Sequence, residues 1–408
     1  MRNTTRRRWR RPAGTVLIGL LCAAIVAGVF FRREVFRLYK VVYLFEPDVI
    51  AKNFRSMSEF FPHHTVSRGG VVYEFKSAPR PLPATYRYEG EERNVMDFLQ
   101  RTSTTGFLVL KNDAIAYEQY WNGHTPDTLH ISWSVGKSFV SALFGIAIAE
   151  GYIASVEDPV TKYAPELKGT GYDGVRIKDV LQMSSGVGFN EDYGDFNSDI
   201  NRMGRVIALG DSIGSFVASL KNERPPGTYH HYVSMDTQVL GMIVRNATGK
   251  PLARYLSEKI WSRIGMQSDA AWIVDDMGME LAFGTLNATL RDYARFGRLY
   301  LRNGDWNGEQ IVPSAWVHDS ITPDAPHLQP GENPASSNRL GYGYQWWIPE
   351  YRDGNDYSAI GVYGQFIYVN PARSVVIVKN SSFADYTRVP DCEPETLEMF
   401  QAIARAMR

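Results

Sequence analysis

The sequence predicts an α/β protein of the α+β kind, in which an antiparallel sheet built from both ends of the chain is flanked by helices and a helical subdomain. Three observations predict it: strand patterns early in the chain, strand patterns again near its end, and mainly helical patterns between them. With 408 residues, 44% of them hydrophobic, the chain can bury a large core.

The elements follow in order. An apolar run at 106–110, a turn at 111–113 and a second run at 114–121 favour an antiparallel β-hairpin. A nearly all-apolar helix follows Ser134 and stops at Gly151. Further helices are expected at 236–246, 252–264 and 290–302. Strands are expected at 343–348, 365–369 and 374–379, followed by a closing helix at 393–407.

The N-terminus predicts a membrane anchor. Residues 14–31 are eighteen residues long with only Thr15 clearly polar, and arginine clusters lie on both sides. That length just suffices to cross a bilayer, and the heavier basic cluster precedes it, so the folded part is expected outside the cytoplasmic membrane, in the periplasm if the cell is Gram-negative. A signal peptide is the competing interpretation, but Arg32-Arg33 stands where a small-residue cleavage site is expected.

Four segments are therefore expected. They are a basic cytoplasmic arm at 1–13, a transmembrane signal anchor at 14–31, a juxtamembrane segment and linker at 32–95, and the main folded domain at 96–408. Residues 1–40 hold ten of the 44 basic residues but one of the 44 acidic ones, which leaves −9 for the remainder. An acidic folded part is the opposite of what nucleic-acid binding requires.

Ser134-Val135-Gly136-Lys137 is the motif that carries chemistry. In a helix, residues i and i+3 share a face, so a lysine amine can reach a serine hydroxyl. A lysine held partly dry loses its proton more easily and can then activate the serine as a nucleophile. A phenol such as Tyr232 would pass the proton to the leaving group. Taken alone, the pair is equally consistent with a helix N-cap and a solvated first-turn lysine.

Several motifs in order resemble one family. They are Trp133 to Ser138, Leu181 to Val187, Pro226-Gly227-Thr228 leading to Tyr232-Val233-Ser234, Asn287 to Gly297 and Gly341 to Trp347. From about Phe107 onward the chain resembles the serine β-lactamase and penicillin-binding protein superfamily, and within it the class C-like 6-aminohexanoate-dimer hydrolase branch. The resemblance implies a β-lactamase/transpeptidase-like fold and no cofactor.

The resemblance also implies roles. Ser134 would be the acylated nucleophile, Lys137 its base and Tyr232 the proton shuttle. Ser234 stands where many relatives have asparagine. The backbone amides of Ser134 and Gln365 would form the oxyanion hole.

The third family motif would fall at Val362-Tyr363-Gly364, where an uncharged valine replaces the usual cationic or imidazole group and puts β-lactamase activity in doubt. The substrate pocket would further include Asn287 and Tyr193, the latter with Asp192 in a loop over the cleft. On local sequence alone, Tyr232 could be a packed aromatic, Asn287 an N-cap and Gly364 an ordinary strand glycine.

The expected activity is cleavage of a small or peptide-like amide or ester through an acyl-enzyme. A D-Ala peptidase or esterase acting on cell-wall fragments is one alternative, and a non-catalytic membrane-tethered sensor is another. No zinc-binding spacing or phosphate-binding loop is present in the sequence. The two cysteines, Cys22 and Cys392, offer no disulfide within the folded domain.

Overall fold

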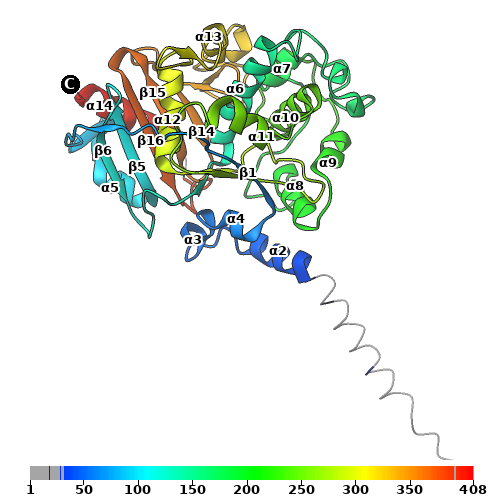
Figure 1. Cartoon of the computed structure of the whole chain (residues 1–408), viewed down its shortest axis with the longest axis horizontal. Helices are drawn as coiled ribbons and strands as arrows, with labels where there is room; N and C mark the ends of the chain where they lie inside the picture. Colours follow the sequence, from blue (N-terminus) through cyan, green and yellow to red (C-terminus); the bar gives the residue numbers. More distant parts are fainter. Residues whose placement is uncertain (1–17, 19–27, 29–31, 390–391, 408) are drawn as a thin grey trace, which may run out of the picture.

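An eight-stranded sheet formed from both ends of the chain lies at the centre of the fold (Figure 1). The computed structural model describes residues 18, 28, 32–389 and 392–407. Neighbouring strands are antiparallel except for the last pair, β6 and β2. In spatial order the strands are β12 (Gly341–Tyr342), β13 (Trp347–Ile348), β14 (Tyr357–Gly361), β15 (Gln365–Asn370), β16 (Val375–Ser381), β5 (Thr104–Lys111), β6 (Ala114–Tyr120) and β2 (Lys76–Ser77).

Helices cover both faces of this sheet, which explains the continuous apolar run in β16. Val375 and Ile377 belong to the hydrophobic cluster that includes helix α14 (Cys392–Ala406), whereas Val376 and Val378 belong to the cluster that includes helix α12 (Leu290–Leu301). Successive side chains of a strand point to opposite faces, so a strand covered twice is apolar throughout.

Helix α6 (Gly136–Ala149) runs through the core, buried along nearly its whole length, between the sheet and the helical part of the molecule (Figure 1). The helical part begins after it. The remaining helices are α2 (Arg32–Val42), α3 (Ile50–Phe54), α4 (Met57–Phe60), α5 (Val95–Arg101), α7 (Ile177–Leu181), α8 (Asp199–Ala208), α9 (Ile213–Ser219), α10 (Ser234–Thr248), α11 (Leu252–Leu256) and α13 (Ser314–Ser320).

A second, four-stranded sheet positions the start of α6. Its order is β1 (His63–Val66), β8 (Ala270–Ile273), β9 (Leu286–Ala288) and β7 (His130–Ile131). Two short ribbons pair β3 (Thr85–Tyr88) with β4 (Glu91–Asn94) and β10 (Asp305–Trp306) with β11 (Glu309–Gln310).

The predicted α+β architecture therefore fits, but the transmembrane helix that formed part of that prediction does not. Among the described residues, no helix is long and apolar enough to cross a membrane. The predicted span at 14–31 lies outside the described residues except for positions 18 and 28. Helix α2, which follows, is amphipathic and charged, and its Arg37 pairs with Asp276 of the folded domain. The anchor prediction is corrected accordingly.

The segment expected to be a linker at 32–95 contributes to the main core. Leu44, Ile50, Phe54 and Val66 are buried there. A turn, the short helix α3 and the four-residue strand β1 carry these residues, so their spacing follows no long helix or strand pattern and the sequence did not reveal their burial.

Candidate active site

Ser134 lies in a tight turn, η1 (Trp133–Val135), that joins β7 to α6. Two glycines pack against this turn. A Cβ atom on Gly361 would lie 2.7 Å from the carbonyl oxygen of Ser132 and 3.1 Å from the nitrogen of Ser134, and one on Gly284 would lie 2.6 Å from the carbonyl carbon of Trp133. Only glycine permits so close an approach of backbone to backbone. The turn holds Ser134 partly exposed at a cavity wall.

Lys137 lies one turn further along, at the start of α6, and its side chain is buried at 1% exposure. Its Nζ atom donates a hydrogen bond of 3.1 Å to Oγ of Ser234. Burial lowers the pKa of Lys137 to about 7, against the opposing effect of the Glu191 and Asp236 carboxylates. Near neutral pH a large share of this amine is therefore uncharged and able to accept a proton.

Ser234, the first residue of α10, links Lys137 to Glu191. Its hydroxyl donates to Oε1 of Glu191 at 2.6 Å, and its backbone N–H donates to Oε2 at 3.0 Å. Tyr193 donates to the same carboxylate at 3.0 Å. Glu191 was not singled out from the sequence, although its neighbours Asp192 and Tyr193 were; its role depends on a contact with a residue 43 positions away.

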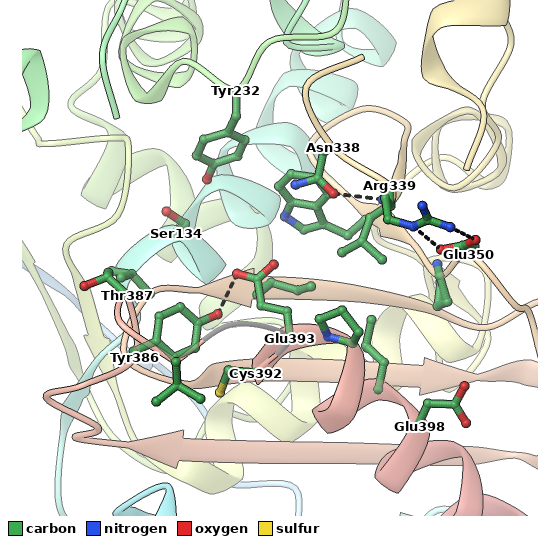
Figure 2. Close-up of a pocket in the computed structure, with 18 of the residues that line it drawn as sticks. Ser134, Tyr232, Asn338, Arg339, Glu350, Tyr386, Thr387, Cys392, Glu393 and Glu398 are labelled. Carbon is green, nitrogen blue, oxygen red and sulfur yellow. Dashed lines mark hydrogen bonds and ion pairs between the residues drawn. The ribbon is translucent and has the colours of Figure 1, made fainter. Parts of the chain in front are cut away.

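Tyr232 stands just before α10 with its hydroxyl directed toward Ser134 (Figure 2). Burial raises the pKa of Tyr232 well above its usual value, while a hydrogen bond with Ser134 lowers it. The phenol therefore keeps its proton at physiological pH. The Lys137 nitrogen lies 5.2 Å from the centre of the Tyr232 ring, so the structure brings the three predicted catalytic side chains together.

The cavity beside these residues has a volume of about 980 Å³. It is rich in aromatic and acidic side chains. The lining residues include Glu89, Ser134, Glu191, Tyr193, Tyr232, Arg339, Trp347, Glu350, Val362, Tyr386, Cys392, Glu393 and Glu398. Among the residues that the structure describes, no three histidine, cysteine or acidic side chains are grouped so as to hold a metal ion.

Val362-Tyr363-Gly364 forms the turn between β14 and β15 rather than part of a strand. Val362 lines the cavity, whereas Tyr363 and Gly364 pack behind it with φ angles of 65° and 89°. Within the described part of the chain, neither the Ser134 amide nor the Val362 amide donates a hydrogen bond to a backbone carbonyl. Both N–H groups remain free for a ligand.

Gln365 is not brought to the cavity. It pairs with Gly361 in the β14–β15 hairpin, and its buried side chain donates to the carbonyl oxygen of Ser381 at 2.7 Å. The difference from the prediction has a simple cause: the turn at 362–364 reverses the chain before Gln365, so Val362 lines the cavity and Gln365 does not.

Asn287 also lies away from the cavity. It is buried in β9 and donates to the carbonyl oxygens of Ala271 and Thr285, which holds the small sheet together. Trp346 is a core residue, whereas Trp347 lines the cavity and stacks on Tyr232 with ring centres 5.3 Å apart. Glu393, a further cavity residue that sequence reasoning missed, accepts a 2.6 Å hydrogen bond from Tyr386.

A serine nucleophile, a buried amine of lowered pKa and a phenol around one cavity define a serine hydrolase. The chain belongs to the β-lactamase family, whose profile matches residues 92–391.

The chain is 33% identical over 343 residues to the 6-aminohexanoate-dimer hydrolase of Paenarthrobacter ureafaciens, a match that covers 81% of this chain and 85% of that protein. A Bacillus anthracis structure provisionally named a 6-aminohexanoate-dimer hydrolase superposes with a TM-score of 0.80 at 29% identity, covering 90% of this chain and 96% of the other. An Escherichia coli protein provisionally named a D-alanyl-D-alanine carboxypeptidase is 24% identical over 185 residues, covering 40% of this chain and 42% of that protein. The chain is thus a serine hydrolase of the β-lactamase-related superfamily.

Proposed function

We propose that this chain hydrolyses an amide or ester bond through a covalent acyl-enzyme on Ser134. The observation that carries the proposal is the convergence of Ser134, Lys137 and Tyr232, with Lys137 buried and bonded to the neutral hydroxyl of Ser234. The similarity to a 6-aminohexanoate-dimer hydrolase supports an amide between amino-acid-like units as the substrate class.

Acylation begins when Oγ of Ser134 attacks the carbonyl carbon and its proton passes to the neutral amine of Lys137. The carbon–oxygen double bond opens, and the oxyanion is held by the amides of Ser134 and Val362. The bond to the leaving group then breaks as Tyr232 delivers a proton to the leaving nitrogen or oxygen and takes one from Lys137.

Deacylation reverses these proton movements with water as the nucleophile. As water attacks the Ser134 ester, Tyr232 takes its proton and passes its own proton to Lys137, and Lys137 then returns a proton to Ser134 as the acid departs. The cycle consumes one water and leaves the enzyme unchanged.

The charges around the cavity favour a neutral or amine-bearing substrate. Five carboxylates line it, and the one cationic side chain among the described lining residues, Arg339, is paired with Glu332 and Glu350. Relatives that hold a substrate carboxylate use a cation where this chain has Val362. A β-lactam or a peptide ending in a D-Ala carboxylate would therefore meet repulsion here.

Hydrolysis by the full chain of a matched substrate panel tests the proposal. The panel contains p-nitrophenyl esters with neutral, amine-bearing and carboxylate-bearing acyl groups, 6-aminohexanoate oligomers, a D-Ala-D-Ala peptide and nitrocefin. We expect turnover of the neutral and amine-bearing esters and of the 6-aminohexanoate oligomers, whose acyl side bears the amine and whose carboxylate is separated from the scissile amide by a flexible methylene chain. We expect little turnover of the carboxylate-bearing ester, the D-Ala-D-Ala peptide and nitrocefin. Turnover confined to the D-Ala peptide or nitrocefin would contradict the proposed substrate preference, and the absence of turnover of every substrate would contradict the proposed hydrolysis itself.

A further inference from the structure

Four aromatic rings form a closed cluster behind the two proposed oxyanion donors. Phe45 follows α2 and Phe54 ends α3, in the segment before the family-matched region; both pack on Trp133 and Tyr363. All six pairs among these rings are in contact, with centres 4.9 to 6.2 Å apart. Phe45 stacks on Tyr363 at 4.9 Å with the ring planes 17° apart.

The two inner rings belong to residues with strained backbones. Trp133 has a φ angle of 42° and Tyr363 one of 65°, a left-handed region that bulky side chains rarely adopt. Such conformations persist only where the surrounding structure enforces them, and they gather at functional sites. Trp133 directly precedes Ser134, so its backbone sets the direction of the Ser134 amide, whereas Tyr363 directly follows Val362 and fixes the course of the turn that carries the Val362 amide.

The backbone side of this arrangement is fixed by close packing. Gly284 and Gly361 press on the turn that carries Trp133 and Ser134, at the distances given above. On the side away from these glycines, the rings of Phe45 and Phe54 pack against Trp133 and Tyr363. Phe54 is fully buried and touches both Trp133 and Tyr363, whereas Phe45 is partly exposed and covers the same pair.

We propose that Phe45 and Phe54 are positioning residues for the reaction. They hold Trp133 and Tyr363 in their left-handed conformations and thereby fix two turns, distant in the sequence but adjacent in the fold, whose amides would bind one oxyanion. The N-terminal segment is then part of the catalytic apparatus. This inference rests on the proposed function, because it assigns no separate chemistry to the cluster.

The test compares full-length variants on one p-nitrophenyl ester. In Phe45→Ala we expect kcat to fall about 10- to 100-fold with KM within about twofold of wild type, because misplaced donors weaken transition-state binding more than substrate binding. The midpoint of the pH–rate profile, which reports Lys137, should stay in place. Phe45→Tyr, which keeps the ring, should restore kcat.

Phe60→Ala is the matched control. Phe60 is a partly buried phenylalanine of α4 that lies against Lys40 and has no ring contact with the cluster. The Phe60→Ala substitution should leave kcat unchanged. Phe45→Leu keeps the apolar volume but not the flat aromatic ring, and it should also lower kcat. If Phe45→Ala does not fold, Phe45→Leu tests the positioning role in its place.

Two failures are distinguishable. If Ser134→Ala is inactive and wild type turns over, but Phe45→Ala or Phe45→Leu keeps wild-type kcat, the positioning role is refuted and the proposed function stands. If Ser134→Ala itself keeps turnover, the proposed function is what fails. A fall in kcat for Phe60→Ala equal to that for Phe45→Ala would also overturn the inference.

Discussion

The buried amine of Lys137 donates its hydrogen bond to the hydroxyl of Ser234, not to a carboxylate. The single hydroxyl proton of Ser234 is given to Glu191, so Ser234 can only accept from Lys137. The lone pair of the uncharged amine is therefore not used by Ser234. It remains available for the proton of Ser134, which is the arrangement that a general base requires.

Ser234→Ala should lower kcat/KM about tenfold, since one buried hydrogen bond of ordinary strength is lost from the base. Ser234→Asn, which introduces the residue found in many relatives, should recover most of the activity because its side chain can also accept from Lys137. Steady-state kinetics on one ester measures both. Equal loss in the two variants would show that the hydroxyl does more than accept this hydrogen bond.

The pH dependence of acylation should follow Lys137. The base works as the neutral amine, so the rate should rise with pH through a midpoint near the pKa of about 7. The Glu191 carboxylate raises that pKa by stabilising the ammonium form. Glu191→Gln should therefore move the midpoint to lower pH, as measured by pre-steady-state acylation across a pH series.

Asp192→Asn provides the control for this shift, because Asp192 lies exposed in the same loop and its carboxylate bonds only to loop backbone. It should leave the midpoint unchanged. A midpoint that stays in place or rises in Glu191→Gln would mean that another group limits the rate.

Glu393→Gln should reduce selectivity for amine-bearing substrates. Figure 2 shows this carboxyl facing the cavity with Tyr386 as its partner. Burial raises the pKa of Glu393, and a nearby substrate ammonium group would favour its charged form. The charged hydrogen bond between them is worth about 1.5–3 kcal/mol, so kcat/KM for an amine-bearing ester should fall about 10- to 100-fold. The uncharged ester of the same length is the control and should change little. Equal losses on both esters would assign Glu393 a structural role.

Gly361→Ala should lower kcat about a hundredfold, because the added Cβ would push β14 away from the turn that carries Ser134. Gly204→Ala is the control: nothing lies within 4 Å of a Cβ at this position in α8. Steady-state kinetics measured together with thermal unfolding distinguishes a loss of catalysis from a loss of folded protein. Wild-type kcat in Gly361→Ala would show that the turn adjusts freely.

Local patterns predicted the parts of the molecule that local interactions determine. The hairpin of β5 and β6, the strands β15 and β16 and the helices α10, α12 and α14 lie where short apolar runs or helical spacing placed them. Of the predicted strand at 343–348 only Trp347–Ile348 (β13) is strand; the chain turns before it, where Gln345 adopts a φ of 64° and its side chain bonds to Thr237. No sequence period encodes such a tertiary contact.

The site shows the same division. Ser134 and Lys137 share one short stretch, so their proximity follows from helix geometry, and the family resemblance supplied Tyr232. Glu191 and Glu393 lie far from Ser134 in the sequence, and only the folded structure brings them to the cavity. The oxyanion donor was predicted at Gln365, which the structure keeps away from the cavity; the turn between β14 and β15 instead places Val362, the donor that we propose, at the cavity wall.

The central claim is that Ser134 is acylated during turnover. Mass spectrometry of the full chain, quenched during hydrolysis of a slowly deacylating p-nitrophenyl ester, tests it most directly. The account predicts one acyl group on the peptide that contains Ser134, and neither adduct nor turnover in a folded Ser134→Ala protein. An adduct on a different residue, or turnover that survives in Ser134→Ala, would contradict it.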